Sequence, residues 1–276
     1  MLVEGLILLL VGLAAGTIGS LAGLGGGVII VPALLFLASV NPQFSMITPP
    51  IAVGTSMLLI VITALSSTLS YSKQKRVDFR SGIVFFLGCG PGAMVGAYLT
   101  RFFQETDVFF ATFGFVLILI SFMLNVKEKG KPKAIQWDVL RSFQEPSGVT
   151  YEYGYHRITA FILSFFIGIL SGLFGVGGGS MMMPMMLLLF GFPPHVATAT
   201  SMFVIFLTAI MGSFTHVIQD NIHWLAAVFL APGAWLGGRF GAWVSLKMNG
   251  RALVIVFRSF LFIIAIRMVL DGLHII

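Results

Sequence analysis

Long uncharged runs limit the fold of this 276-residue chain more than any other feature of its sequence. No Asp, Glu, Lys or Arg occurs between Gly5 and Ser72. About 20 apolar residues are enough for a helix to cross the roughly 30 Å hydrocarbon layer of a bilayer. Only 9% of all residues are charged, whereas soluble domains carry roughly 25%. The sequence therefore predicts an integral membrane protein.

The apolar segments favour helices over strands. A transmembrane strand barrel needs segments of about 10 residues with alternating polarity, and the sequence does not show that pattern. We therefore expect an all-α membrane fold. The first apolar block lacks the basic residues of a secretory signal, so we expect it to be a mature span. The predicted blocks are residues 5–39, 48–72, 81–100, 108–125, 158–190, 195–218, 224–246 and 252–270.

Three motifs recur in the same order in the two halves of the chain. They pair GTIGSLAGLGGGVIIVP (16–32) with GILSGLFGVGGGSMMMP (168–184), AVGTSM (52–57) with ATATSM (197–202), and PGAMVGA (91–97) with PGAWLGG (232–238). We infer a duplicated unit. Residues 1–125 form the first predicted transmembrane repeat, 158–276 form the second, and the polar stretch 126–157 links them.

The basic residues predict the orientation of the repeats. They gather in two segments and comprise Lys73, Lys75, Arg76 and Arg80, and then Lys127, Lys129, Lys131, Lys133, Arg141 and Arg157. Basic loops favour the cytoplasmic side of the plasma membrane, so we expect a cytoplasmic linker and both termini outside. Residues 219–223, the second-half counterpart of the first basic loop, contain no Lys or Arg. The two repeats are therefore predicted to be inverted.

Inversion requires the first block of each repeat to enter the membrane and return. Each block is then a re-entrant hairpin or a pair of full crossings, which gives eight to ten helical segments in all. The glycine triplets are the predicted turns, near the interface of the repeats. Pro32 and Pro184 are expected as helix breaks in or near the first turn of the returning helix, where a missing N–H costs little. The returning arms, 28–39 and 180–190, are too short to span alone.

The glycine triplets also suggest a binding site. Unwound backbone within a membrane must find partners or line a wet cavity, and a helix that restarts there presents free N–H groups and a positive dipole end that bind anions. Inverted repeats with Gly- and Pro-interrupted segments are typical of transporters. The glycines assigned to the substrate are Gly23, Gly25, Gly26, Gly27, Gly175, Gly177, Gly178 and Gly179.

Close helix packing is the alternative role for membrane glycines. We prefer it for the pair Gly12 and Gly16 and for the pair Gly88 and Gly92, which lie outside the triplets. Alanine at the middle of each triplet is expected to obstruct an oxyanion while leaving stability intact.

Several polar residues inside apolar blocks are further candidates. The matched hydroxyls of Thr55, Ser56, Thr200 and Ser201 either donate to substrate oxygens or bond back to their own helical turn. His216 is a candidate for a proton or gating role, with interfacial packing as the alternative. Arg239 is a candidate substrate ligand because of its depth in the segment, unless its side chain reaches the nearby interface.

Other function classes have little support in the sequence. It contains no HExxH, C-x-x-C or Walker motif and no paired nucleophile and base, so we expect no enzyme, metal or cofactor. The net charge of +6 comes mostly from loop residues, which argues against a nucleic acid partner. The expected partners are membrane lipids and a small anionic substrate, and a homodimer is left open.

The paired motifs, together with Thr215 and His216 near the end of the sixth block, resemble the TauE/SafE sulfite exporter family of small membrane proteins. The resemblance covers the chain except its central linker. It implies transport of sulfite or related organosulfonates, usually as export. Our leading interpretation is thus a secondary transporter that works by alternating access. The alternatives are an anion channel of the same architecture and a membrane scaffold that does not transport.

Overall fold

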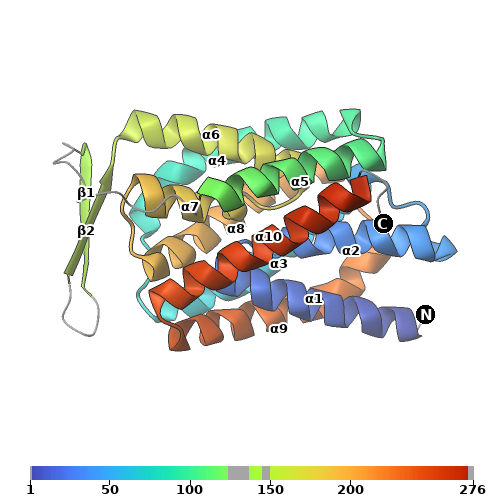
Figure 1. The fold of residues 1–276 in the computed structure, drawn as a ribbon, viewed down its shortest axis with the longest axis horizontal. Coiled ribbons are helices and arrows are strands. Elements are labelled where there is room, and N and C mark those ends of the chain that lie inside the picture. The colour runs from blue at the N-terminus through green and yellow to red at the C-terminus, as the bar shows by residue number, and fades with distance from the viewer. Residues whose placement is uncertain (1, 124–136, 145–149, 273–276) are drawn as a thin grey trace.

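The computed structural model describes residues 2–123, 137–144 and 150–272 (Figure 1). The predicted helical fold is confirmed. Within these residues lie the helices α1 (Leu2–Ala22), α2 (Gly27–Val40), α3 (Pro49–Lys73), α4 (Phe79–Leu99), α5 (Thr106–Met123), α6 (Arg157–Phe174), α7 (Gly179–Leu189), α8 (Pro194–Ile218), α9 (Trp224–Lys247) and α10 (Gly250–Gly272). Short 3-10 turns lie at Pro42–Phe44 and Thr100–Phe102.

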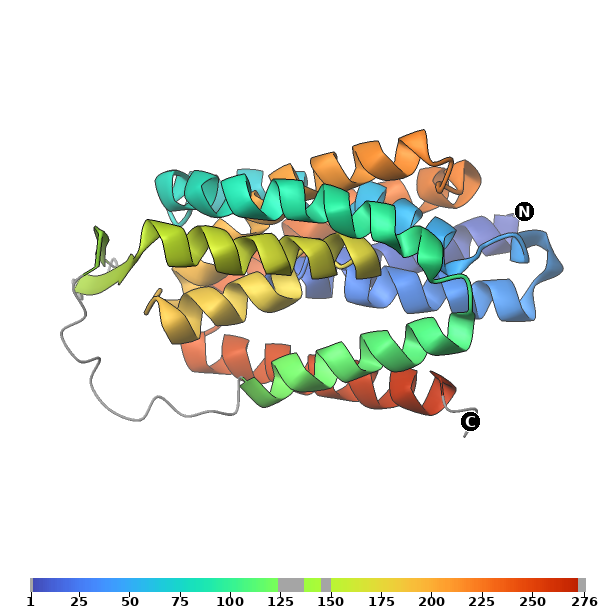
Figure 2. The same cartoon turned by 90° about the horizontal axis from the view of Figure 1, so that it is seen from above.

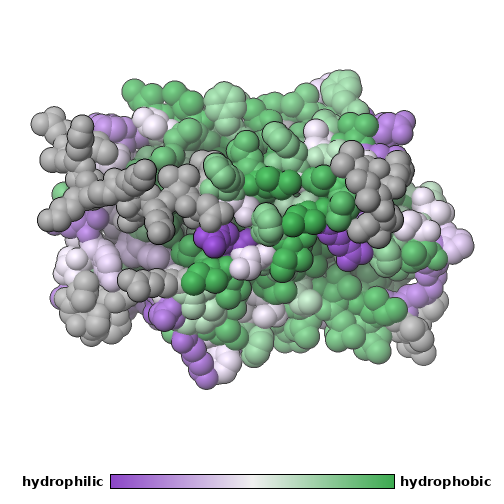
Figure 3. All heavy atoms as spheres, viewed as in Figure 1, coloured by the Kyte–Doolittle hydropathy of each residue, from purple (hydrophilic) through white to green (hydrophobic). Residues whose placement is uncertain are grey.

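Seven of the helices in the described residues are long and apolar enough to cross a membrane. Hydrophobic residues cover most of the face drawn in Figure 3, between more polar ends. The helices α2 and α7 have only 14 and 11 residues, or roughly 21 Å and 16 Å at 1.5 Å per residue. The chain is therefore a multi-pass membrane protein in which α2 and α7 are too short to cross the bilayer.

The two short helices complete hairpins. In Figure 1, α1 enters the bundle from one end and α2 returns to that end, whereas α6 enters from the opposite end and α7 returns there. The first helix begins and the last helix ends at the same end of the bundle, opposite the strands β1 and β2. The inversion of the repeats and their sidedness in a membrane stay predictions.

Glycine seams join the long helices of the two halves. Helix α1 packs along α9, and α4 packs along α6. A Cβ atom on Gly12 would lie 2.3 Å from the carbonyl oxygen of Leu230, and one on Gly88 would lie 2.4 Å from that of Phe161. Real Cβ contacts do not come this close, so the backbones touch. The packing role predicted for these glycines is confirmed. Helices α5 and α10 cross as a separate layer (Figure 2).

We expect Gly88→Ala to destabilise the protein by about 1–3 kcal/mol, the usual cost of overpacking a core. The new methyl group would push α4 away from α6, and this outweighs the gain in helix propensity. Ile83→Ala is the control, because Ile83 lies on α4 and is 49% exposed. Thermal unfolding in detergent measures both variants. Equal melting temperatures for the two would contradict the tight seam.

The central segment contains an unexpected β-hairpin. Strand β1 (Val139–Gln144) pairs with β2 (Thr150–Tyr155) in antiparallel register. The hydroxyl of Tyr153 donates to Oδ2 of Asp78 at 3.1 Å, and this fastens the hairpin to the start of α4. From the sequence we expect only a linker here. The β-branched and aromatic residues on either side of the sequence Pro-Ser-Gly are a hairpin signal that the sequence analysis did not use. Residues 124–136 and 145–149 of the linker lie outside the described residues.

The two hairpin prolines lie one residue further into the returning helices than expected. Helices α2 and α7 begin directly at the last glycine of each triplet, which places Pro32 and Pro184 inside their second turn. Each proline therefore removes one intrahelical hydrogen bond, to the carbonyl of Val28 or of Ser180. The glycines alone break the helices, and the prolines weaken the returning arms near their starts.

Candidate functional site

The two glycine turns share one backbone conformation. In the first turn φ is 72° at Gly23, 78° at Gly25 and 95° at Gly26. In the second turn, the matching φ values are 67°, 73° and 74°, at Gly175, Gly177 and Gly178. Residues with a Cβ rarely adopt this left-handed conformation. The triplets therefore form the predicted turns, with the same three left-handed positions in each.

The turns meet at the centre of the bundle. A Cβ atom on Gly27 would lie 2.1 Å from the carbonyl oxygen of Gly175. The Cγ2 atom of Ile60 lies 3.0 Å from the Cβ position of Gly25 and 2.8 Å from that of Gly177. Ile205 makes the matching contacts at 3.1 and 2.9 Å. One isoleucine from each half thus touches both turns.

The predicted serines reach the turns from the opposite half of the chain. The Oγ of Ser56 donates to the carbonyl oxygen of Gly175 at 2.8 Å. The Oγ of Ser201 lies 3.4 Å from the carbonyl oxygen of Gly23 and also donates to Thr198 of its own helix at 2.9 Å. The hydroxyls therefore hold the two halves together in this conformation.

The neighbouring threonines bond to the starts of helices. The Oγ1 of Thr55 accepts from the backbone N–H of His223 at 2.9 Å, and that of Thr200 accepts from the N–H of Asp78 at 3.0 Å. His223 and Asp78 are the N-caps of α9 and α4. In this conformation the threonines position two long helices, a role that neither of our two interpretations had anticipated.

Helices α2 and α7 begin at the meeting point of the turns. The carbonyl of Gly26 accepts from Ile29 and Ile30, so the N–H groups of Gly27 and Val28 precede the hydrogen-bond ladder of α2. Likewise, the carbonyl of Gly178 accepts from Met181 and Met182, so the first N–H groups of α7 precede its ladder. Two positive helix ends thus lie at the centre of the molecule.

The two turns differ in the space around them. The Cβ position of Gly26 lies 2.8 Å from the carbonyl oxygen of Ala15, a backbone atom that cannot move aside. That of Gly178 lies 3.4 Å from Sγ of Cys89 and 3.5 Å from Oγ of Ser171. Our expectation that alanine leaves stability intact is therefore wrong for Gly26, where the methyl group would collide with the backbone.

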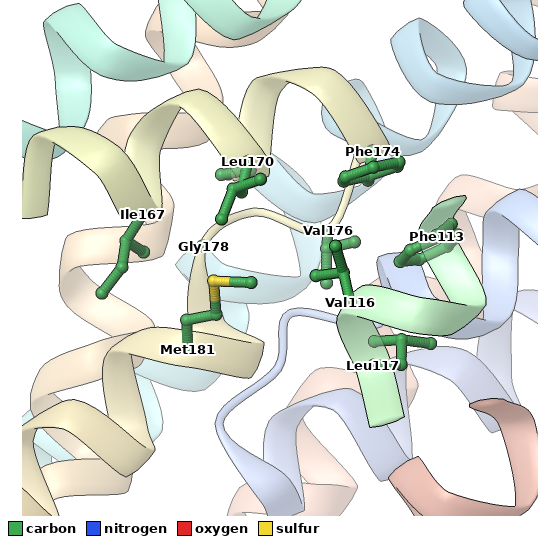
Figure 4. Close-up of a pocket in the computed structure, with 10 residues that line it drawn as sticks. Phe113, Val116, Leu117, Ile167, Leu170, Phe174, Val176, Gly178 and Met181 are labelled. Atoms are coloured by element: carbon green, nitrogen blue, oxygen red, sulfur yellow. The ribbon is translucent and has the colours of Figure 1, made fainter. Parts of the chain in front are cut away.

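A small cavity lies beside Gly178 (Figure 4). Its volume is about 10 Å³, which is about the room that one water needs. The rings of Phe113 on α5 and Phe174 on α6 stack at its edge with centroids 5.1 Å apart. The Oγ of Ser171 lines the cavity and has no hydrogen-bond partner among the described residues. Sequence reasoning missed Ser171, which lies one helical turn before Gly175, at the position where the first repeat has Gly19.

The structure separates the two remaining candidates. His216 is fully buried beside the backbone of Gly172, close to the second turn, and its ring nitrogens have no well-formed hydrogen bond among the described residues. Its counterpart Tyr71 donates to the carbonyl of Ser20 at 2.9 Å. Arg239 lies on the exposed face of α9, apart from the buried turns. A substrate role for Arg239 stays a prediction that this arrangement does not favour.

The N-cap histidine of α9 gives a test by pH. Burial lowers the pKa of His223, and its Nδ1 accepts from the N–H of Ala226 at 3.1 Å. In the unfolded chain His223 binds a proton near pH 6.5, whereas in the folded chain it does so only at lower pH. The contribution of His223 to stability is thus complete above about pH 6.5 and is lost as pH falls toward the lowered pKa.

We therefore expect His223→Asp, which keeps a capping acceptor, to remove this pH dependence. Between about pH 7.5 and about pH 5.5, which bracket the ordinary histidine pKa, the melting temperature of the parent should fall further than that of the variant. An equal fall in the two proteins would show that His223 does not titrate on unfolding.

Comparisons with known proteins agree with this architecture. The family model described as sulfite exporter TauE/SafE matches residues 8–268. The protein of Bacillus subtilis strain 168 named "Probable membrane transporter protein YunE" is 47% identical over 268 residues, which cover 97% of this chain and 98% of that protein. "Probable membrane transporter protein MJ0441" of Methanocaldococcus jannaschii is 27% identical, with 96% and 95% covered. No solved structure matches the chain. The chain belongs to the sulfite exporter TauE/SafE family of membrane transporters.

Proposed function

We propose that this protein is a secondary transporter that exports sulfite or a related small organosulfonate by alternating access. The observation that carries the proposal is the meeting of two left-handed glycine turns at the centre of the bundle, each directly before a helix N-terminus. Helix N-termini bind anions through free N–H groups and the helix dipole. A site of this kind takes an oxyanion without a buried basic side chain.

The second turn is the better candidate for direct contact with the anion. Gly178 leaves space on its Cβ side, whereas Gly26 is closed by Ala15. The Oγ of Ser171 adds a donor without a partner among the described residues, in the cavity beside Gly178. We propose that the first N–H groups of α7 and the hydroxyl of Ser171 hold the oxyanion.

The closed state of the site supports alternating access. The cavity of about 10 Å³ takes about one water and has no room for a four-atom oxyanion, so the helices must separate for substrate to enter. Helix α1 packs on α9 as α6 packs on α4, and α3 packs on α9 as α8 packs on α4. This set of contacts is unchanged when the halves are exchanged, which supports inverted repeats that rock about a central site.

Flux of labelled anions into vesicles that contain the purified protein tests the proposal. We expect saturable uptake of sulfite, or of one member of a panel of organosulfonates, that is stimulated by the same anion on the opposite side. Flux that neither saturates nor responds to anion on the opposite side would favour the channel. If the flux of every anion is no greater than in empty vesicles, both the transporter and the channel are excluded, and the interpretation as a membrane scaffold remains.

A further inference from the structure

A second, much larger cavity lies apart from the glycine turns, at the end of the bundle that carries the β-hairpin. Its volume is about 560 Å³. Helices α4 and α6 and both strands contribute to its walls. Its lining comprises Arg80, Val84, Leu87, Val139, Arg141, Tyr155, Arg157, Ile158 and Phe161.

The polar part of this cavity is strongly basic. Three arginines line it, from the first turn of α4 (Arg80), from β1 (Arg141) and from the start of α6 (Arg157), and none of the lining residues is acidic. Asp78 lies behind Arg141, with Oδ2 3.9 Å from its Nε. Among the described residues, Arg80 and Arg157 have no ion-pair partner. The nearby carboxylate of Asp138 pairs with His156 and accepts the backbone N–H of Arg157.

The rest of the cavity is apolar and continues onto the outer surface of the bundle. Ile158 is 75% exposed, Leu87 is 56% exposed and Phe161 is 46% exposed. On a membrane protein these outward faces of α4 and α6 lie against lipid chains. The ligand that fits this cavity therefore carries a phosphate-like anion at one end and hydrocarbon at the other.

We propose that this cavity binds the phosphate headgroup of an anionic phospholipid, with the acyl chains along the apolar wall. Basic pockets beside membrane helices recognise such headgroups, and arginine forks match phosphate oxygens. Free phosphate and the proposed substrate also carry anionic oxygens, but they have no hydrocarbon to contact the apolar wall. The site is independent of the proposed transport function, because it needs only the membrane and the geometry of this end.

The cavity is connected to the transport core through Asp78. Its carboxylate accepts from the hydroxyls of Tyr153 and Ser81 and faces Arg141. Its backbone N–H donates to Thr200, which precedes the serine beside the first glycine turn. A bound headgroup thus holds β1, β2 and the start of α4 together. Phosphatidylglycerol is therefore expected to raise the melting temperature of the parent protein.

Binding of phosphatidylglycerol to the purified, delipidated protein tests the proposal, with native mass spectrometry as the readout. The test variant Arg80→Gln/Arg157→Gln changes two exposed side chains and keeps the pair of Arg141 and Asp78. The matched control, Lys73→Gln/Lys247→Gln, removes the same charge from exposed helix ends outside the cavity. Thermal unfolding shows that both variants are folded.

We expect binding of phosphatidylglycerol to weaken about 25-fold in the arginine variant and little in the lysine control, since a basic side chain near an anionic surface contributes about 1 kcal/mol. Phosphatidylcholine should bind weakly, and millimolar phosphate or sulfite should not displace phosphatidylglycerol. Equal binding by the two variants would overturn the site. Displacement by free phosphate or sulfite would overturn the lipid in favour of a soluble oxyanion. Neither result depends on whether the protein transports sulfite.

Discussion

Replacing Gly178 with alanine is expected to reduce sulfite transport at least about tenfold, the effect of losing one hydrogen bond to a charged group. The new methyl group would occupy the space between the turn, Cys89 and Ser171, where we place the oxyanion. Its contacts, at 3.4 Å and beyond, are ordinary. The folded protein should therefore lose only the about 1 kcal/mol that a left-handed alanine costs.

Gly191→Ala is the control that distinguishes a blocked anion site from the destabilisation caused by alanine in a left-handed conformation. Gly191 has a similar φ of 66°, and its Cβ position has nothing within 4 Å. Both variants should melt at similar temperatures, while only Gly178→Ala loses uptake into vesicles. If the two transport alike, the space beside the second turn has no part in anion binding.

The second large effect is expected at Gly27, where alanine should cost about 3 kcal/mol or more, at the upper end of overpacking penalties. Its Cβ would lie 2.1 Å from the carbonyl oxygen of Gly175 and 2.9 Å from Cα of Val176. That carbonyl is already held by Ser56, so the second turn cannot retreat without breaking a buried hydrogen bond. The gain of about 1 kcal/mol in helix propensity is too small to compensate.

Gly90→Ala is the matched control for Gly27→Ala. Gly90 is also helical, but the three atoms nearest to its Cβ position all belong to the side chain of Phe86, which can rotate. We expect the fraction of protein that elutes as one defined species in size-exclusion chromatography, and the melting temperature, to fall sharply for Gly27→Ala and slightly for Gly90→Ala. A parental melting temperature for Gly27→Ala would mean that the turns are not in contact.

The turns and the membrane segments could be predicted because their causes are local. Length and apolarity define a span, and three glycines in apolar sequence have few uses besides a break. Repetition of the same spacing around Gly23 and Gly175 then predicted a second copy of the turn. These features depend on neighbours in the sequence and not on what packs against them.

The partners of the buried side chains could not be predicted, because they lie far away in the sequence. Ser56 bonds to Gly175 and Thr200 bonds to Asp78, and a pattern of hydroxyls in apolar blocks does not reveal which carbonyl or amide they meet. The space beside Gly178 and the exposure of Arg239 are likewise set by other helices. The matching sequences of the two turns also do not reveal that they differ in the space around them. The carbonyl of Ala15 blocks the Cβ side of Gly26, and no backbone atom is as near to that of Gly178.

The central claim is that the oxyanion binds where the two glycine turns meet. The most direct measurement is a crystal structure of the Cys89→Ser protein crystallised in the presence of selenite, an analogue of sulfite whose selenium can be located by anomalous scattering. We predict one strong peak within hydrogen-bond distance of the first N–H groups of α7 and of the hydroxyl of Ser171. A peak found only elsewhere, such as among Arg80, Arg141 and Arg157, would contradict the assignment of the transport site to the glycine turns.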